Sequence, residues 1–144
     1  MNQRTILLYA MCTVLFSACG AAAQAASCPD AIDVQQQLTT PVAGWTTTLD
    51  DTPHQLSGIT FYDGPPKEEA SLVYDQITRA ARKETAIWRF APGSDRQTWM
   101  ACSYSGTAIV LARALPPKTV SCSVTYNRQQ FVAGLPLIES VVCK

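Results

Sequence analysis

The clearest pattern of apolar and polar positions lies between residues 97 and 126, where three short runs alternate in character. The small-residue pair Ser105-Gly106 separates the first two runs and predicts a hairpin. With a two-residue loop, Cys102 faces Ile109. The third run alternates from Val120 to Tyr126 and predicts a half-buried antiparallel strand with one wet face. The expected core face of the hairpin consists of Met100, Cys102, Tyr104, Ile109 and Leu111.

Shorter apolar runs outside this region predict further strands. Pro66 with Lys67-Glu68-Glu69 predicts the start of one short helix near residues 66–80, because proline suits a first turn and carboxylates suit the positive helix end. Residues 127–136 read as irregular. Short strands punctuated by Pro and Gly predict a mainly β, single-domain antiparallel β-sandwich or small barrel. The additional strands are expected at 28–38, 45–49, 56–62, 86–90 and 137–143.

The N-terminal region reads as a targeting segment. Arg4 precedes an apolar run, residues 6–16, that is as long as a signal-peptide core and too short to span a bilayer. Ala23-Gln24-Ala25 predicts cleavage before Ala26, which leaves 1–25 as signal peptide and 26–144 as one mature β domain. In a second interpretation, residues 15–19 resemble a lipobox and Cys19 is lipidated. The first places the protein in the periplasm or outside the cell, the second on the outer membrane, and neither involves a transmembrane helix.

Four cysteines remain after the targeting segment, Cys28, Cys102, Cys122 and Cys143, and an even number in a short exported domain predicts two disulfides. The preferred pairing is Cys28–Cys143 with Cys102–Cys122, because the first and last strands would bring their ends together; the other two connectivities stay open. In a simple meander the strands carrying Cys102 and Cys122 would lie about 10 Å apart, beyond the reach of a disulfide. That bridge therefore requires the 119–126 strand to lie across a sandwich, or on the outer side of the 97–104 strand.

The charge and the motifs of the chain argue against several classes of function. The chain has 11 basic and 11 acidic residues, so removal of Arg4 with the signal segment leaves a net charge of −1. No basic stripe is present, which argues against nucleic-acid binding. The sequence has one histidine and no CxxC pair, so neither a zinc site nor any other metal or cofactor site is expected.

Candidate chemistry is sparse. His54 is the lone imidazole and no GxSxG motif accompanies it, so a loop or strand-edge histidine is the preferred interpretation. The acidic pair Asp50-Asp51 fits a turn, and Glu68-Glu69 fits the helix start. Tryptophans in a small domain are expected mainly to fill the core, with Trp99 the one most exposed. If a binding site exists, Trp45, His54 and Trp99 are its candidate residues.

Several motifs together carry a family resemblance. They are Cys28-Pro29, Gly44-Trp45, the run 56–66, Trp88-x-Phe90, Trp99-x-x-Cys102-x-Tyr104-x-x-Thr107, Leu111, Leu115-Pro116, Cys122 and Gly134-Leu135-Pro136. With these motifs the chain resembles the STY0301 family of small exported proteobacterial proteins, and the likeness covers nearly all of the mature chain. The resemblance implies export and four mature cysteines, and it implies no activity, ligand or catalytic residue.

These observations favour an exported, non-enzymatic binding or interaction domain of the bacterial envelope, whose partner is an unknown protein or a cell-wall component. One alternative is a periplasmic inhibitor or immunity protein against a cell-wall-degrading enzyme. Another is an envelope polysaccharide hydrolase. The hydrolase would require His54 or an acidic pair inside a deep pocket with an aromatic wall.

Overall fold

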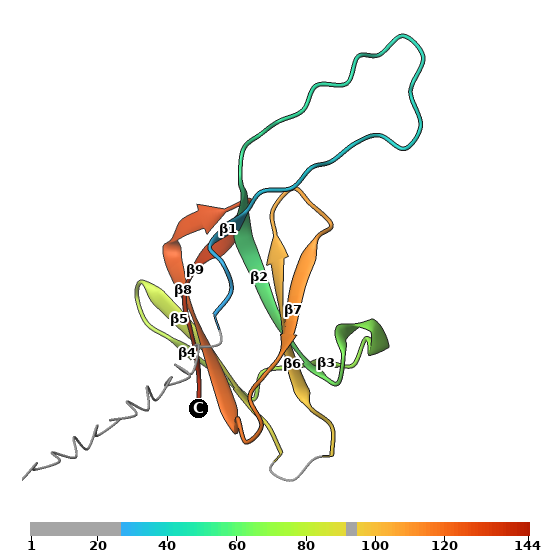
Figure 1. The fold of residues 1–144 in the computed structure, drawn as a ribbon. Coiled ribbons are helices and arrows are strands. Elements are labelled where there is room, and N and C mark those ends of the chain that lie inside the picture. The colour runs from blue at the N-terminus through green and yellow to red at the C-terminus, as the bar shows by residue number, and fades with distance from the viewer. Residues whose placement is uncertain (1–26, 92–94) are drawn as a thin grey trace, which may run out of the picture.

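Two open antiparallel sheets face each other in the computed structural model, which describes residues 27–91 and 95–144 (Figure 1). The predicted signal peptide and the alternative lipidation site at Cys19 lie outside the described residues. The first sheet has the order β1-β2-β6-β7, with β3 also paired to β2, and the second has the order β4-β5-β8-β9. The strands are β1 (Ala31–Ile32), β2 (His54–Asp63), β3 (Ser71–Leu72), β4 (Gln76–Arg79), β5 (Lys83–Arg89), β6 (Thr98–Tyr104), β7 (Val110–Ala114), β8 (Ser121–Val132) and β9 (Leu135–Cys143).

Aromatic and aliphatic side chains from both sheets form one core. Phe61 of β2 is fully buried, and its ring lies 4.9 Å from the ring of Trp88 on β5 and 5.7 Å from that of Phe90. The indole Nε1 of Trp88 donates to the carbonyl oxygen of Leu72 at 3.1 Å, so its polar edge is satisfied inside the sandwich. The expected sandwich is confirmed, and the sheets do not close into a barrel.

The predicted β6–β7 hairpin is present with a longer loop. Cys102 lies opposite Leu111, not Ile109, so the loop gains residues on the β7 side. A shift of two residues keeps every side chain on its predicted face. The expected burial of Ile109 and Leu111 is nevertheless wrong: both are exposed, because β7 is an edge strand of its sheet. The β6 half of the predicted face, Met100, Cys102 and Tyr104, is buried as expected.

The third strand of the predicted set, β8, lies in the opposite sheet between β5 and β9. Its alternation is confirmed at Cys122 and Val124, which are both buried. The expectation of irregular structure over 127–136 is wrong, since β8 continues to Val132 and β9 begins at Leu135. The two residues between them have positive φ angles of 50° and 82°, which is the twist that a tight hairpin turn requires.

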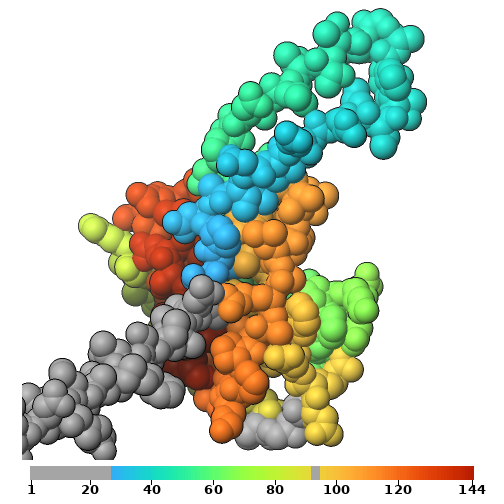
Figure 2. Space-filling model, in the orientation of Figure 1, coloured from blue at the N-terminus to red at the C-terminus, as the bar shows by residue number. Residues whose placement is uncertain are grey.

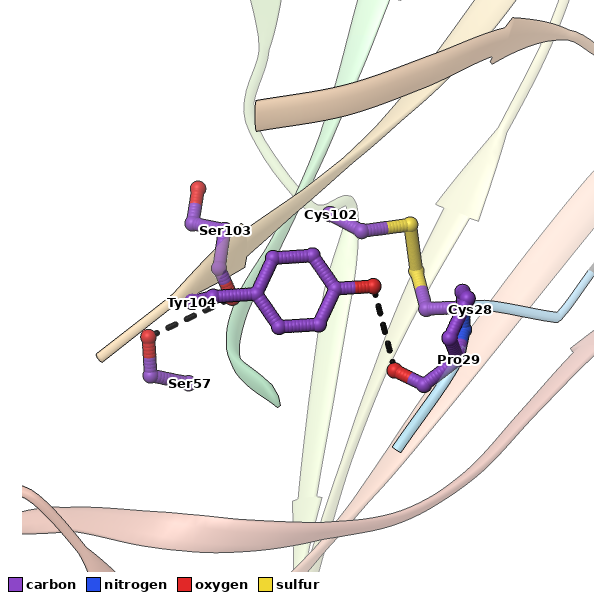
Figure 3. Close-up of a disulfide and its surroundings, with 6 residues drawn as sticks. All are labelled: Cys28, Pro29, Ser57, Cys102, Ser103 and Tyr104. Carbon is purple, nitrogen blue, oxygen red and sulfur yellow. Dashed lines mark hydrogen bonds between the residues drawn. A yellow bond between two sulfur atoms is a disulfide. The ribbon is translucent and has the colours of Figure 1, made fainter. Parts of the chain in front are cut away.

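One disulfide joins Cys28 to Cys102 (Figure 3), and the other joins Cys122 to Cys143, so the preferred pairing is wrong. β1 pairs with β2 in the first sheet, whereas β9 pairs with β8 in the second, so the first and last strands are not the antiparallel neighbours that the preferred pairing required. Cys122 lies directly opposite Cys143 in the β8–β9 register. A Cys102–Cys122 disulfide would have required β8 to lie across the sandwich from β6 or on its outer side, and β8 does lie in the opposite sheet. Cys102 nevertheless bonds Cys28 in the N-terminal segment.

The helix predicted near residues 66–80 is wrong beyond its first turn. A single 3-10 turn covers Pro66–Glu68 and ends at Glu69, whose φ is 57°. The following residues form β3 and β4, because the free edges of β2 and β5 offer backbone partners. The strands expected at 28–38 and 45–49 reduce to the two residues of β1. Among the described residues, no helix is long and apolar enough to cross a membrane.

Candidate functional site

Residues 33–53, which connect β1 to β2, form a long loop that stands away from the sandwich (Figures 1 and 2). We refer to this segment as the β1–β2 loop. Apart from Val34, every residue in it is exposed. A loop of this length without secondary structure of its own is uncommon in a small domain and usually has a function. Its exposed large apolar side chains are Leu38, Val42, Trp45 and Leu49.

A tight turn within this loop presents Trp45 to solvent. The backbone N–H of Trp45 donates to the carbonyl oxygen of Val42 at 3.2 Å, and Gly44 has a φ of 82°, a conformation that glycine adopts without strain. Trp45 is 81% exposed. The expectation that the tryptophans fill the core therefore holds for Trp88 and is wrong for Trp45. The expectation that Trp99 is the most exposed tryptophan is also wrong, since Trp99 is half-buried.

Side-chain hydrogen bonds fix the base of the β1–β2 loop. His54 Nδ1 lies 2.7 Å from the carbonyl oxygen of Ser105; because a carbonyl only accepts, Nδ1 carries the hydrogen and donates. The other ring nitrogen lies 3.4 Å from Gln36 Nε2, and the same amide nitrogen donates to the carbonyl oxygen of Gly106 at 3.3 Å. His54 thus joins one limb of the loop to the other and to the β6–β7 turn.

A second polar contact shapes the limb that leads into β2. The carboxylate of Asp50 accepts from the Thr52 hydroxyl at 2.6 Å and from the Thr52 backbone N–H at 3.0 Å. These bonds, the hydroxyl bond first, lower the pKa of Asp50 below its ordinary value. Asp50 therefore stays ionised, and with Asp33 and Asp51 it gives the loop three carboxylates and no basic residue.

A hollow of about 1280 Å³ lies between the two limbs of the β1–β2 loop. Glutamine, threonine and aspartate make up half of the residues that line it, and His54, Ser105 and Gly106 border it at the base. The remaining lining residues are apolar: Val34, Leu38, Pro41, Leu49 and Pro53. Figure 2 shows the loop standing clear of the strands below, with open space between its limbs. The wall is not aromatic, so it differs from the pocket that a polysaccharide hydrolase would need.

The three residues proposed as a binding site do not share one cleft. Trp99 lies opposite Tyr62 near the far end of β2, whereas His54 begins that strand. Eight residues of extended chain separate the two ends by about 27 Å. Trp45 projects from the β1–β2 loop and Trp99 is half-buried. Within residues 27–91 and 95–144, no three His, Cys, Asp or Glu side chains come close enough to hold a metal ion.

Two hairpin tips add exposed apolar side chains at the same end of the sandwich. The β6–β7 and β8–β9 tips both lie near the base of the β1–β2 loop in Figure 1. Ile109 and Val110 are exposed at the first tip, and Phe131 and Leu135 at the second. This grouping was not predicted, because residues 127–136 were expected to be irregular and Ile109 was expected to lie in the core.

The opposite end of the sandwich has a different character. A hollow of about 780 Å³ there is bordered by charged side chains, among them Arg96. That guanidinium forms ion pairs with Asp63 and Glu68, and these carboxylates raise its pKa above the ordinary value. Its charge is therefore engaged within the protein.

Fold and site together define a disulfide-bonded β-sandwich that presents a protruding loop, a construction common among binding domains. The family model described as Type VI secretion system Tli immunity protein matches residues 51–144, and the chain belongs to this family. The match covers β2 to β9, while residues 33–50 of the β1–β2 loop precede it. No curated protein and no solved structure matched the chain.

Proposed function

We propose that this protein is a periplasmic immunity protein that binds a toxin delivered by a type VI secretion system and blocks its action. The observation that carries the proposal is the family match, which extends over the whole sandwich from β2 onwards. The two disulfides support the compartment, because such bonds form and persist in oxidising surroundings such as the periplasm. Immunity to a toxin is therefore preferred over the general binding function that the sequence favoured.

Binding, not catalysis, is the activity that this role requires. His54, the residue that any imidazole-dependent hydrolase would have to use, is engaged at both ring nitrogens by Ser105 and Gln36. Its side chain connects the β1–β2 loop to the β6–β7 turn through these contacts. The resemblance to the STY0301 family is compatible with an immunity role, since it too implies a small exported domain with four cysteines.

The proposed partner is a protein toxin that acts in the envelope. A cell-wall-degrading enzyme is the toxin class expected from the sequence, and we keep it as the first candidate. Comparison of peptidoglycan and membrane lipids from intoxicated cells will show which polymer the toxin attacks. A toxin that degrades lipid would change the partner's enzymatic class and leave the immunity role intact.

A growth assay tests this function. The candidate toxin is sought among type VI effector genes next to the gene of this protein. It is directed to the periplasm of a sensitive strain, where it should stop growth. Co-expression of the full chain should restore growth, whereas a version without residues 1–25 should stay in the cytoplasm and give no protection. Continued growth arrest in cells that contain folded, exported protein would refute the proposed function.

A further inference from the structure

We infer that the β1–β2 loop is the main toxin-binding element, and that it inserts into a concave cleft of the toxin with apolar walls and a basic rim. This inference rests on the proposed immunity function and names the surface that performs it. It concerns the loop of residues 33–53, with the β6–β7 and β8–β9 tips as the platform around its base.

The apolar content of the loop is the first argument. Leu38, Val42 and Leu49 are all more than half exposed, and Trp45 is 81% exposed. Exposed apolar groups that gather on one element mark an interaction surface, whereas scattered ones need no explanation. Tryptophan is also among the residues that contribute most to binding energy when a partner buries them. Trp45 is therefore the expected anchor of the complex.

The fixed base of the loop is the second argument. The contacts of Gln36 and His54 with the β6–β7 turn hold both limbs at the sandwich. The bonds between Asp50 and Thr52 order the limb that leads into β2. A loop anchored in this way loses less conformational freedom on binding than a free chain of the same length. The arrangement suits a projection that enters a cleft.

Charge selects the kind of cleft. Three aspartates and no lysine or arginine occur in residues 33–53, so the loop is acidic although the whole chain is neutral. Complementary charges across an interface accelerate association and reject wrong partners. A rim of lysine or arginine around an apolar cleft matches both features of the loop.

The family match includes the sandwich from β2 onwards and excludes the exposed large apolar residues of the β1–β2 loop. The match begins at residue 51, and the apolar residues of the loop, from Leu38 to Leu49, all precede it. An immunity protein must discriminate among toxins, and discrimination depends on local contacts presented by a common framework. The sandwich supplies that framework, and the loop supplies contacts outside it.

The inference is tested by measuring how tightly the protein, purified from the periplasm, binds the candidate toxin. The toxin used in this measurement has its catalytic residue replaced. Trp45→Ala should weaken binding by at least about tenfold, because it removes the expected anchor. Val73→Ala is the matched control, since Val73 is also 81% exposed but lies in the β3–β4 connection at the far end of β2. The control should bind within about twofold of wild type.

A charge reversal tests the basic rim separately. Asp51→Lys should slow association and reduce its dependence on salt, because attraction between the loop and the rim is lost. Glu69→Lys makes the same change of charge next to the 3-10 turn and should leave association unchanged. Thermal unfolding of each variant should match wild type, which shows that binding losses do not arise from misfolding.

The outcomes separate the two proposals. If wild-type protein binds the toxin and Trp45→Ala and Asp51→Lys bind equally well, the loop inference is wrong and the immunity function stands. Binding through the exposed edge of β7 would give this result. If wild-type protein does not bind the toxin, both proposals fail. Weakened binding by the loop variants alone, with both controls intact, supports the inference.

Discussion

At the scale of the residue, burial decides which aromatic groups stabilise the fold and which remain for binding. Phe61 has no exposed surface and contacts rings from the opposite sheet, whereas Trp45 contacts solvent over most of its surface. Tyr104 combines both characters: its ring is buried and its hydroxyl donates to the carbonyl oxygen of Pro29 at 3.1 Å (Figure 3). That bond supports the segment that carries Cys28.

Tyr126 makes the fold sensitive to alkaline pH. Burial first, and the nearby carboxylate of Glu84 second, raise the pKa of its phenol above the ordinary value near 10. A raised pKa in the folded state means that the stabilisation is complete below pH 10 and is lost as pH rises through the folded value. The free energy of unfolding should therefore fall above pH 10.

In Tyr126→Phe the free energy of unfolding should fall less steeply with rising pH, as measured by urea unfolding at several pH values between about 9 and 11. Tyr74→Phe is the control, because Tyr74 is exposed. An unchanged slope in Tyr126→Phe would show that other groups cause the alkaline sensitivity.

At the scale of the element, strand pairing determines what the cysteines can reach. β8 and β9 place Cys122 opposite Cys143, so this disulfide closes one hairpin. Cys28 precedes β1 and bonds Cys102 of β6 across a sequence separation of 74, which ties the segment before β1 to the first sheet. The two disulfides therefore constrain very different lengths of unfolded chain.

Removal of each disulfide should reveal this difference. Loop entropy predicts a loss of about 4.5 kcal/mol for Cys28→Ala/Cys102→Ala and about 3.3 kcal/mol for Cys122→Ala/Cys143→Ala. Urea unfolding without reductant measures both losses, and peptide mapping of the unreduced protein should recover the same two pairs. A larger loss from the Cys122–Cys143 pair, or any other pair in the map, would contradict this account.

The elements that the sequence predicted well are those with local signals. The alternation that predicted β6 and β8 is visible without knowledge of neighbouring strands, and the apolar runs that predicted β2 and β5 are equally local. The helix prediction failed because the proline and acidic residues at 66–69 describe only a turn, and strand partners then override helical spacing. The cysteine pairing failed because it depends on which sheet each terminal strand joins, and that choice has no local signal.

The candidate site was harder to predict than the fold. Trp45 was named from the sequence, but as a member of a cleft with Trp99, and the sheet places those residues apart. Exposure of Leu38, Val42 and Leu49 could not be foreseen, since the same residues would suit a strand that packs on the core. Only the absence of strand partners for the segment turns them outward.

At the scale of the molecule, the two ends of the sandwich differ in their suitability for a partner. One end carries the β1–β2 loop and two apolar hairpin tips. The other carries charged groups that the protein itself engages, such as Arg96 with Glu68. The molecule is thus a disulfide-bonded framework that carries the β1–β2 loop and two hairpin tips at one end, where the proposed immunity function places the toxin.

If the protein acts by binding a toxin, the two proteins should form a stable complex, which size-exclusion chromatography with light scattering detects. Mature protein and the catalytically inactive neighbouring toxin, mixed at about 10 µM, should co-elute as a complex of defined stoichiometry if the dissociation constant lies in the nanomolar range of inhibitor complexes. Two separate peaks with the masses of the free proteins would contradict the account.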